Sequence, residues 1–114
     1  MYITQTINPQ TFRSMNLTVD EDGFLMDQTQ WSSEVAQQIA TLAGVGHLSE
    51  LHWQVIDLVR GRYFSLGVVP SMRDLCRELG ARKFVVKNQF GSCRNMWQIA
   101  GLPHPGEEML AYME

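Results

Sequence analysis

Apolar and polar positions alternate near the start of the chain, as they do in β-strands with one buried face. Apolar side chains fall at alternating positions in residues 2–7 (Ile3 and Ile7) and again in residues 15–19 (Met15, Leu17 and Val19), which places them on one face of an extended strand. Residues 8–11 and 20–23 have the Asn, Pro, Asp and Gly content of turns, and the second turn leads into residues 24–26. The N-terminal segment therefore predicts a three-stranded β-meander, which is too thin to fold alone and must pack on the rest of the chain.

From Trp31 onward, apolar residues recur three and four positions apart, which is the spacing of helices. Ser or Pro residues stand where helices are expected to begin, and Gly residues stand where they are expected to end. Residues 83–90 are ambiguous, because Val85-Val86 also fits a strand. About five helices are expected: one capped by Ser32 or Ser33 and ended by Gly44, one from Ser49 to Gly67, one from Pro70 to Gly80, one over residues 83–90, and one capped by Ser92 and ended by Gly101.

Beyond Pro103 the chain has no pattern that pairs with the rest, so residues 104–114 are expected to form a C-terminal arm on a single domain of residues 1–103. The end of the arm is apolar at Met109, Leu110 and Met113, with acidic residues on either side. Such a segment can pack back on its own domain, fold on a partner or remain disordered. The pattern as a whole predicts an α+β fold, in which the meander packs on the array of helices and the arm follows.

The composition is that of one folded domain. The chain has 114 residues, of which 45% are hydrophobic and 18% charged, so it can build one core. No stretch approaches the roughly 20 apolar residues of a membrane span, and no signal peptide is visible, so a cytoplasmic location is expected. The two cysteines and three histidines lack the close spacing of zinc motifs, so neither a metal site nor a cofactor is expected.

The net charge of −3 conceals an uneven distribution of charge along the chain. Residues 60–94 contain eight basic and two acidic residues, whereas the rest of the chain contains ten acidic residues and one arginine. A basic face of this kind can meet an acidic protein, RNA or DNA, or it can be a solvated helical surface. The overall acidity, with a pI near 5.5, weighs against nucleic acid.

Four short segments carry a resemblance that the patterns alone do not supply. They are Gly23-Phe24-Leu25 followed by Trp31; His52-Trp53-x-Val55-Ile56 followed by Arg60 and Tyr63; Pro70-x-x-Arg73-x-Leu75; and Ile99-Ala100-Gly101-Leu102-Pro103-x-Pro105. In this order and spacing they resemble the DsrC/TusE family of sulfur-relay proteins. The resemblance runs from Gly23 to Pro105, roughly three-quarters of the chain.

The resemblance implies a fold, a reaction and partners. The fold is a β-meander on orthogonal helices, with a helix-turn-helix-like pair among them. TusE-like members accept persulfide sulfur and pass it toward the enzyme that thiolates the tRNA wobble uridine, and DsrC-like members are the substrate-carrying partner of dissimilatory sulfite reductase. Both types use a cysteine next to the C-terminus, and the sulfite-reductase type adds a second cysteine about ten residues earlier.

At both cysteine positions this sequence departs from the family. Aligned on residues 100–103, the terminal cysteine falls on Glu108 and the upstream one on Trp97. A carboxylate and an indole cannot form a persulfide, which requires a nucleophilic thiolate. The leading hypothesis is therefore a non-catalytic binding or regulatory homologue that engages sulfur-relay or sulfite-reductase-type proteins.

Two other functions remain open at this point. Cys93 lies beside Arg94 and near a helix start, both of which favour a thiolate, so it could carry sulfur in a tRNA 2-thiouridine or sulfite reductase pathway. It is placed on the body of the protein, however, and an inert surface or half-buried thiol is the alternative. The other function is a DNA-binding regulator, in which the helix-turn-helix-like pair and basic residues such as Arg73 and Lys87 contact phosphates.

Four residues are candidates for binding. Arg60 and Arg73 can anchor the arm or an anion, because the family's arm folds back toward this region, although ordinary salt bridges are an equal alternative. Trp97 is expected to be a hydrophobic plug where the arm docks. His104 stands at the family's lysine position and is expected to be solvated. Cys76 is expected to be a core or boundary thiol.

Overall fold

The computed structural model describes residues 15–70, 72–80, 83–111 and 113. Its regular elements are six α-helices and one short 3-10 helix. In chain order they are η1 (Gln28–Gln30), α2 (Ser33–Leu42), α3 (Glu50–Leu66), α4 (Met72–Leu79), α5 (Lys83–Phe90), α6 (Cys93–Ile99) and α7 (Glu107–Ala111).

The two predicted strands that fall within the described residues, 15–19 and 24–26, are not formed. Over the residues that the structure describes there is no β-strand, and Val19 and Leu25 form only an isolated antiparallel bridge. The α+β prediction is therefore wrong, and the described chain is all-helical. The predicted strand at residues 2–7 lies outside the described residues.

The alternation in residues 15–19 reflects buried side chains and not a sheet. Leu17, Val19 and Phe24 are all buried in the hydrophobic core. Between them, the Asp20 carboxylate accepts hydrogen bonds from the backbone N–H groups of Asp22 (2.9 Å) and Phe24 (3.0 Å). The Asp20 side chain thus closes a tight turn. A β-sheet would instead need several backbone-to-backbone hydrogen bonds between the two segments. One buried face can pack on helices as well as on a second sheet, so a period of two does not by itself require a strand.

The predicted helices are confirmed. They could be predicted because the residues that cap them are close to them in the sequence. Ser32 accepts a hydrogen bond from the backbone of Val35 at the start of α2, and Ser49 forms a capping box with His52 at the start of α3. Gly67 ends α3 with φ = +69°, in the left-handed region that glycine favours. Residues 83–90 form helix α5, so their interpretation as a strand is excluded.

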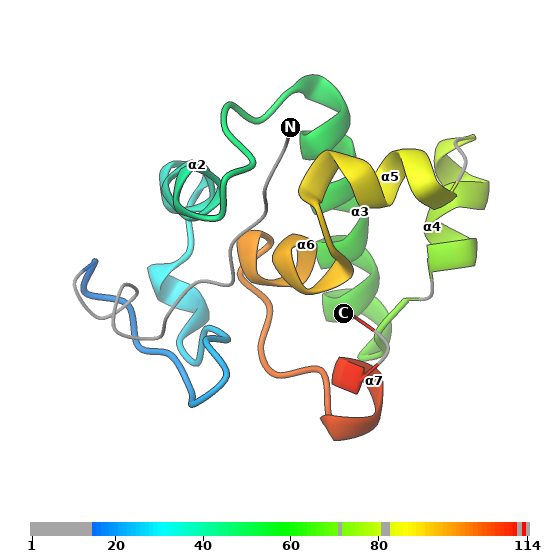
Figure 1. Ribbon diagram of the computed structural model, residues 1–114. Helices are drawn as coiled ribbons and strands as arrows, with labels where there is room; N and C mark the ends of the chain where they lie inside the picture. The colour runs from blue at the N-terminus through cyan, green and yellow to red at the C-terminus, as the bar shows by residue number, and fades with distance from the viewer. Residues whose placement is uncertain (1–14, 71, 81–82, 112, 114) are drawn as a thin grey trace.

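Helix α6 lies in the middle of the molecule, with α2 on one side and α3, α4 and α5 on the other (Figure 1). It contacts both α2 and α5, and all of its residues except Arg94 are buried. The side chain of Trp97 is completely buried. A short helix buried on nearly every side must have its polar backbone ends satisfied by the protein itself.

The chain beyond α6 folds back on the body. It passes below α6 and α3 to reach α7 (Figure 1). Leu110 of α7 packs against the hydrophobic core, and Met113 is buried. The backbone N–H of Arg94 donates a hydrogen bond to the carbonyl of Met113 at 3.1 Å. The division into a domain of residues 1–103 and an arm of residues 104–114 stays a prediction.

None of the helices in the described part of the chain combines the length and the apolar content that a membrane crossing requires.

Replacing Gly101 by alanine is expected to destabilise the protein by about 2–4 kcal/mol, because the new Cβ would overlap the Trp31 indole and the residue has φ = +69°. Gly67→Ala is the matched control, since Gly67 has the same φ of +69° but open space around its Cβ position. That control is expected to lose only about 1–2 kcal/mol. Urea unfolding of both variants measures the difference, and equal losses would show that the Trp31 contact is unimportant.

Candidate functional site

The C-terminal end of α6 is held by three side chains from distant parts of the chain. The carbonyls of residues 99–101 accept hydrogen bonds, in turn, from Trp31 Nε1 (3.0 Å), Arg60 Nη1 (2.7 Å) and Gln28 Nε2 (2.6 Å). Carbonyls at the end of a helix have no partner within the helix, and buried ones must find one elsewhere. These three donors therefore fix the point at which the chain leaves α6. The chain from residue 102 onward is called the C-terminal segment below.

Arg60 combines this hydrogen bond with aromatic stacking. Its guanidinium carbon lies 3.8 Å from the centre of the Trp31 ring and 5.0 Å from that of Phe64. Partial burial lowers the pKa of Arg60 from its ordinary value, and the charge of Asp57 acts in the opposite direction. A cation at the C-terminal end of a helix is also favourably placed with respect to the helix dipole. The structure thus places Arg60 at the base of the C-terminal segment.

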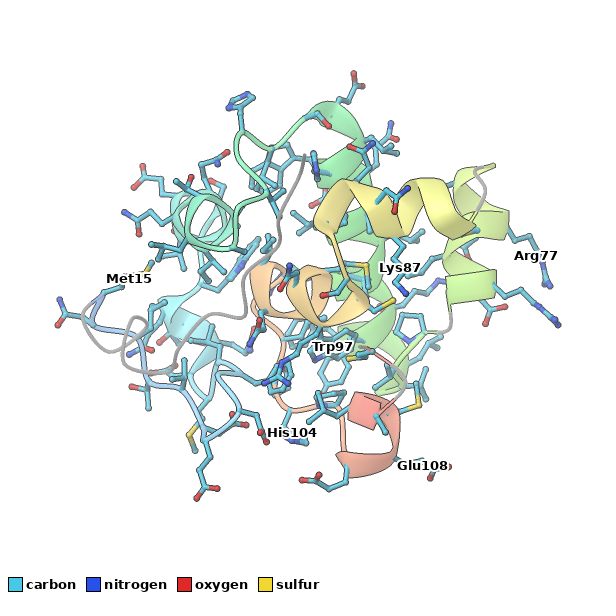
Figure 2. All side chains as sticks on the ribbon, viewed as in Figure 1. Met15, Arg77, Lys87, Trp97, His104 and Glu108 are labelled. Carbon is cyan, nitrogen blue, oxygen red and sulfur yellow. The ribbon has the colours of Figure 1, made fainter. Side chains whose placement is uncertain are left out.

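Arg73 is placed differently from Arg60. It is exposed on α4, one helical turn before the equally exposed Arg77. Figure 2 shows Arg77 pointing outward on the side of the molecule remote from His104. The structure therefore does not bring Arg73 together with the other candidate residues, and any role in binding belongs to a separate surface.

Trp97, which the sequence resemblance aligns with the family's upstream cysteine, is completely buried. Its Nε1 donates a hydrogen bond to the carbonyl of Pro103 at 2.6 Å, and the Tyr63 ring meets it edge-on with the ring centres 5.6 Å apart. The indole fills the core beneath the first residues of the C-terminal segment. This position offers neither a thiol nor access to solvent.

Glu108, which the sequence resemblance aligns with the family's terminal cysteine, is exposed in the first turn of α7. Figure 2 shows it pointing outward from the molecule. The next residues, Met109 and Leu110, are half-buried. The structure therefore exposes a carboxylate at this position.

Both cysteines of the chain are buried. Cys93 is 9% exposed and Cys76 is 8% exposed, and both belong to the hydrophobic core. Cys93 is the first residue of α6, as the sequence pattern predicts, but it is more buried than the expected surface or half-buried thiol. Burial limits the access of a sulfur donor to either thiol.

His104 is half-buried and hydrogen-bonded. The prediction that it is solvated is therefore wrong. Its Nε2 lies 3.0 Å from Asp22 Oδ2, and its Nδ1 accepts a hydrogen bond from the backbone N–H of Gly106 at 2.9 Å. Because Nδ1 is an acceptor, the ring proton is on Nε2, which donates a hydrogen bond to Asp22. The ring also meets Phe24 edge-on, with the ring centres 5.2 Å apart. His104 therefore links the C-terminal segment to the 20–22 loop.

An acidic groove of about 560 Å³ opens beside His104. It is lined by residues 19–22, Met26, His104, Gly106 and Glu107. Sequence reasoning did not identify the two polar residues that connect this region to the C-terminal segment, Gln28 and Asp22. Asp22 is 82 positions from His104, and no local spacing could have paired them.

Replacing Trp97 by cysteine, the residue type that the sequence resemblance implies at this position, is expected to destabilise the fold by about 3–5 kcal/mol, because it empties a large buried site. Trp97→Phe should lose less, about 1–3 kcal/mol, since it keeps a ring but leaves the Pro103 carbonyl without its donor. Thermal and urea unfolding measure both. A cysteine variant within about 1 kcal/mol of the parent would mean that the indole is not needed for packing.

The chain is similar to known proteins over most of its length. Residues 11–108 match the family model described as DsrC like protein. The chain is 32% identical over 103 residues to sulfurtransferase TusE of Pectobacterium atrosepticum, covering 82% of this chain and 94% of that protein. It is 30% identical over 97 residues to the gamma subunit of the dissimilatory-type sulfite reductase of Nitratidesulfovibrio vulgaris, covering 83% and 92%.

A solved structure agrees with these sequence relatives. The oxidized gamma subunit of the dissimilatory sulfite reductase (DsrC) from Archaeoglobus fulgidus superimposes with a TM-score of 0.67 and 32% sequence identity. The superposition covers 79% of this chain and 90% of that one. By sequence and by structure, the chain belongs to the DsrC-like family, which includes the TusE sulfurtransferases and the gamma subunits of dissimilatory sulfite reductase.

Proposed function

We propose that this protein binds partners of the sulfur relay, or of a sulfite-reductase-type enzyme, without itself carrying sulfur. The observation that carries the proposal is the pair of residues at the family's two cysteine positions. One is the buried Trp97 and the other is the exposed Glu108. The frame of a sulfur carrier is kept, and the group that would hold the sulfur is replaced.

The chemistry supports a role without sulfur transfer. A persulfide forms when a thiolate attacks a sulfur donor, and neither a carboxylate nor an indole can take that part. The thiols that the chain does possess, Cys76 and Cys93, are buried in the core. Burial works against Cys93 as a relocated carrier, because the thiol must meet a donor held by another protein.

The geometry also supports binding. The C-terminal segment is anchored at its base by Arg60, Trp31 and Gln28, and Glu108 is exposed on the α7 turn beyond it. A protein of this shape can occupy a partner's docking surface and present a carboxylate where a carrier presents its cysteine. Its effect on the partner would be regulatory, because it would exclude a competent carrier from the same surface.

The nucleic-acid alternative gains nothing from the relatives, which are named as sulfurtransferases and as a sulfite reductase subunit. Two of the basic residues in the 60–94 segment are also engaged within the protein. Arg60 binds the end of α6, and Arg62 pairs with Glu78. We therefore do not propose DNA or RNA as a partner.

The folded protein is expected to gain no sulfur when it is incubated with a low-molecular-weight persulfide donor, because both of its thiols are buried. Glu108→Cys should gain one sulfur at residue 108, since that position is exposed. Intact mass spectrometry followed by peptide mapping measures both outcomes. The variant also serves as the positive control for the donor.

Sulfur added to the unmodified protein and abolished by Cys93→Ser would overturn the proposal in favour of a relocated carrier. Sulfur added only after the protein is unfolded by urea would instead agree with burial as the protecting factor.

Capture from a native lysate should recover proteins of sulfur metabolism on the immobilised full chain. Reversing the charge at the exposed position 108, with Glu108→Lys, is expected to lower that recovery by about threefold or more, because the side chain would face the partner. Glu50→Lys is the control, since Glu50 is an exposed acid in the first turn of α3. Quantitative mass spectrometry gives the readout. Recovery of no sulfur-metabolism protein, or equal recovery by both variants, would count against the proposal.

A further inference from the structure

Three possible metal ligands converge where the C-terminal segment meets the 20–22 loop. His104 Nε2 lies 3.0 Å from Asp22 Oδ2 and 3.7 Å from Glu107 Oε1. One ligand atom from each of the three residues lies within 4.8 Å of the other two. Figure 2 shows His104 between the loop that precedes η1 and helix α7. The sequence has no local metal motif, and only folding brings these residues together.

The separations suit a small divalent cation. Zinc bound tetrahedrally at about 2.0–2.1 Å from each ligand would place the ligand atoms about 3.3–3.4 Å apart. The two distances from His104 Nε2, 3.0 and 3.7 Å, lie on either side of that value. Small rotations of the Glu107 side chain, which is 90% exposed, can equalise them. The three ligand atoms are therefore close enough to share one cation once the Glu107 side chain has rotated.

The chemical nature of the ligands selects among cations. One imidazole nitrogen and two carboxylate oxygens favour Zn²⁺ over Mg²⁺ or Ca²⁺, which prefer all-oxygen sites. Three protein ligands leave one coordination position for water. The acidic groove lies beside the same three residues, so this position can open toward solvent.

Metal binding would require a change of tautomer at His104. Without metal, Nδ1 accepts from Gly106 N–H and Nε2 carries the proton. A cation on Nε2 needs that proton on Nδ1, which then needs an acceptor. Gly106 has φ = +101° and open space around it, and glycine allows the peptide between residues 105 and 106 to turn over. The Pro105 carbonyl would then face Nδ1 and accept its proton.

We propose that Asp22, His104 and Glu107 form a Zn²⁺ site that fastens α7 to the 20–22 loop. The bound ion would tie together two segments that are far apart in the chain, and it would stabilise the C-terminal segment in its docked position. The site is independent of the proposed partner binding, because none of its ligands stands at either cysteine position of the family.

The test is a titration of the full chain with ZnCl2 in which isothermal titration calorimetry measures the heat of binding. A parallel titration uses MgCl2. One Zn²⁺ site is expected, and no heat is expected from Mg²⁺. Glu107→Gln should weaken Zn²⁺ binding by about tenfold or more, because it removes one charged ligand. Glu108→Gln is the matched control, since it changes the neighbouring exposed glutamate of the same helix turn, which is outside the cluster. That control should bind like the unmodified protein.

Two further variants separate this site from other zinc-binding groups. His104→Gln should abolish binding, whereas His47→Gln, at an exposed histidine elsewhere, should leave it unchanged. Saturating ZnCl2 should raise the melting temperature of the unmodified protein but not that of Glu107→Gln. Because Glu107 is exposed, this variant tests the site even if His104→Gln fails to fold. No Zn²⁺ binding, equal binding by Glu107→Gln and Glu108→Gln, or binding lost only with Cys76→Ser or Cys93→Ser would overturn the proposal.

Discussion

The rest of the structure depends on how the buried C-terminal end of α6 is satisfied. Ile99 and Ala100 are fully buried, and a helix end in such a place leaves carbonyls that water cannot reach. The three donors are Gln28 in η1, Trp31 directly after η1, and Arg60 in α3. Because each unsatisfied buried carbonyl would cost about 1–3 kcal/mol, these bonds fix the position of the N-terminal region against α6.

The hydrogen bonds at the C-terminal end of α6 separate an inner position in α6 from an outer position in α7. The inner residue, Trp97, is completely buried and donates a hydrogen bond to the Pro103 carbonyl. The outer residue, Glu108, is exposed. A change of residue at the outer position alters what a partner meets and leaves the packing untouched. A change at the inner position must be accommodated by the core. The proposed loss of both family cysteines is compatible with this division, because the outer position leaves the core unchanged and the inner one is filled by a packed indole.

The parts of the fold that the sequence predicts correctly are those set by neighbours along the chain. Ser32, Ser49 and Ser92 cap helices through bonds to residues three positions away, so their effect is readable from local spacing. The prediction of a β-meander is wrong because an alternating pattern indicates that one face of the segment is buried, but it does not indicate which element covers that face. At Leu17 and Val19 the covering comes from helices, and the turn at Asp20 limits pairing to a single bridge.

The candidate site divides in the same way. Motifs shared with the family point to Arg60 and Trp31, because the resemblance spans both. Gln28 and Asp22 are polar residues of ordinary type whose partners, the Gly101 carbonyl and His104, lie 73 and 82 positions away. Only the folded chain brings them together. The burial of Cys93 is likewise a tertiary property, since its neighbours in sequence include the charged Arg94.

Charge is the remaining difference between this C-terminal segment and the one that the family implies. The family resemblance implies a lysine at the position of His104, and a lysine would place a permanent positive charge beside Asp22 and Glu107. While Nδ1 accepts from Gly106, His104 donates a hydrogen bond to Asp22 but adds no charge. The carboxylates of the 20–22 loop and of α7 are then left without a permanent cation among the cluster residues, at the point where the segment turns toward Glu108. With Asp22 and Glu107 on either side of His104 and Glu108 beside them on α7, this end of the segment is acidic, which favours a cation or a basic partner surface there.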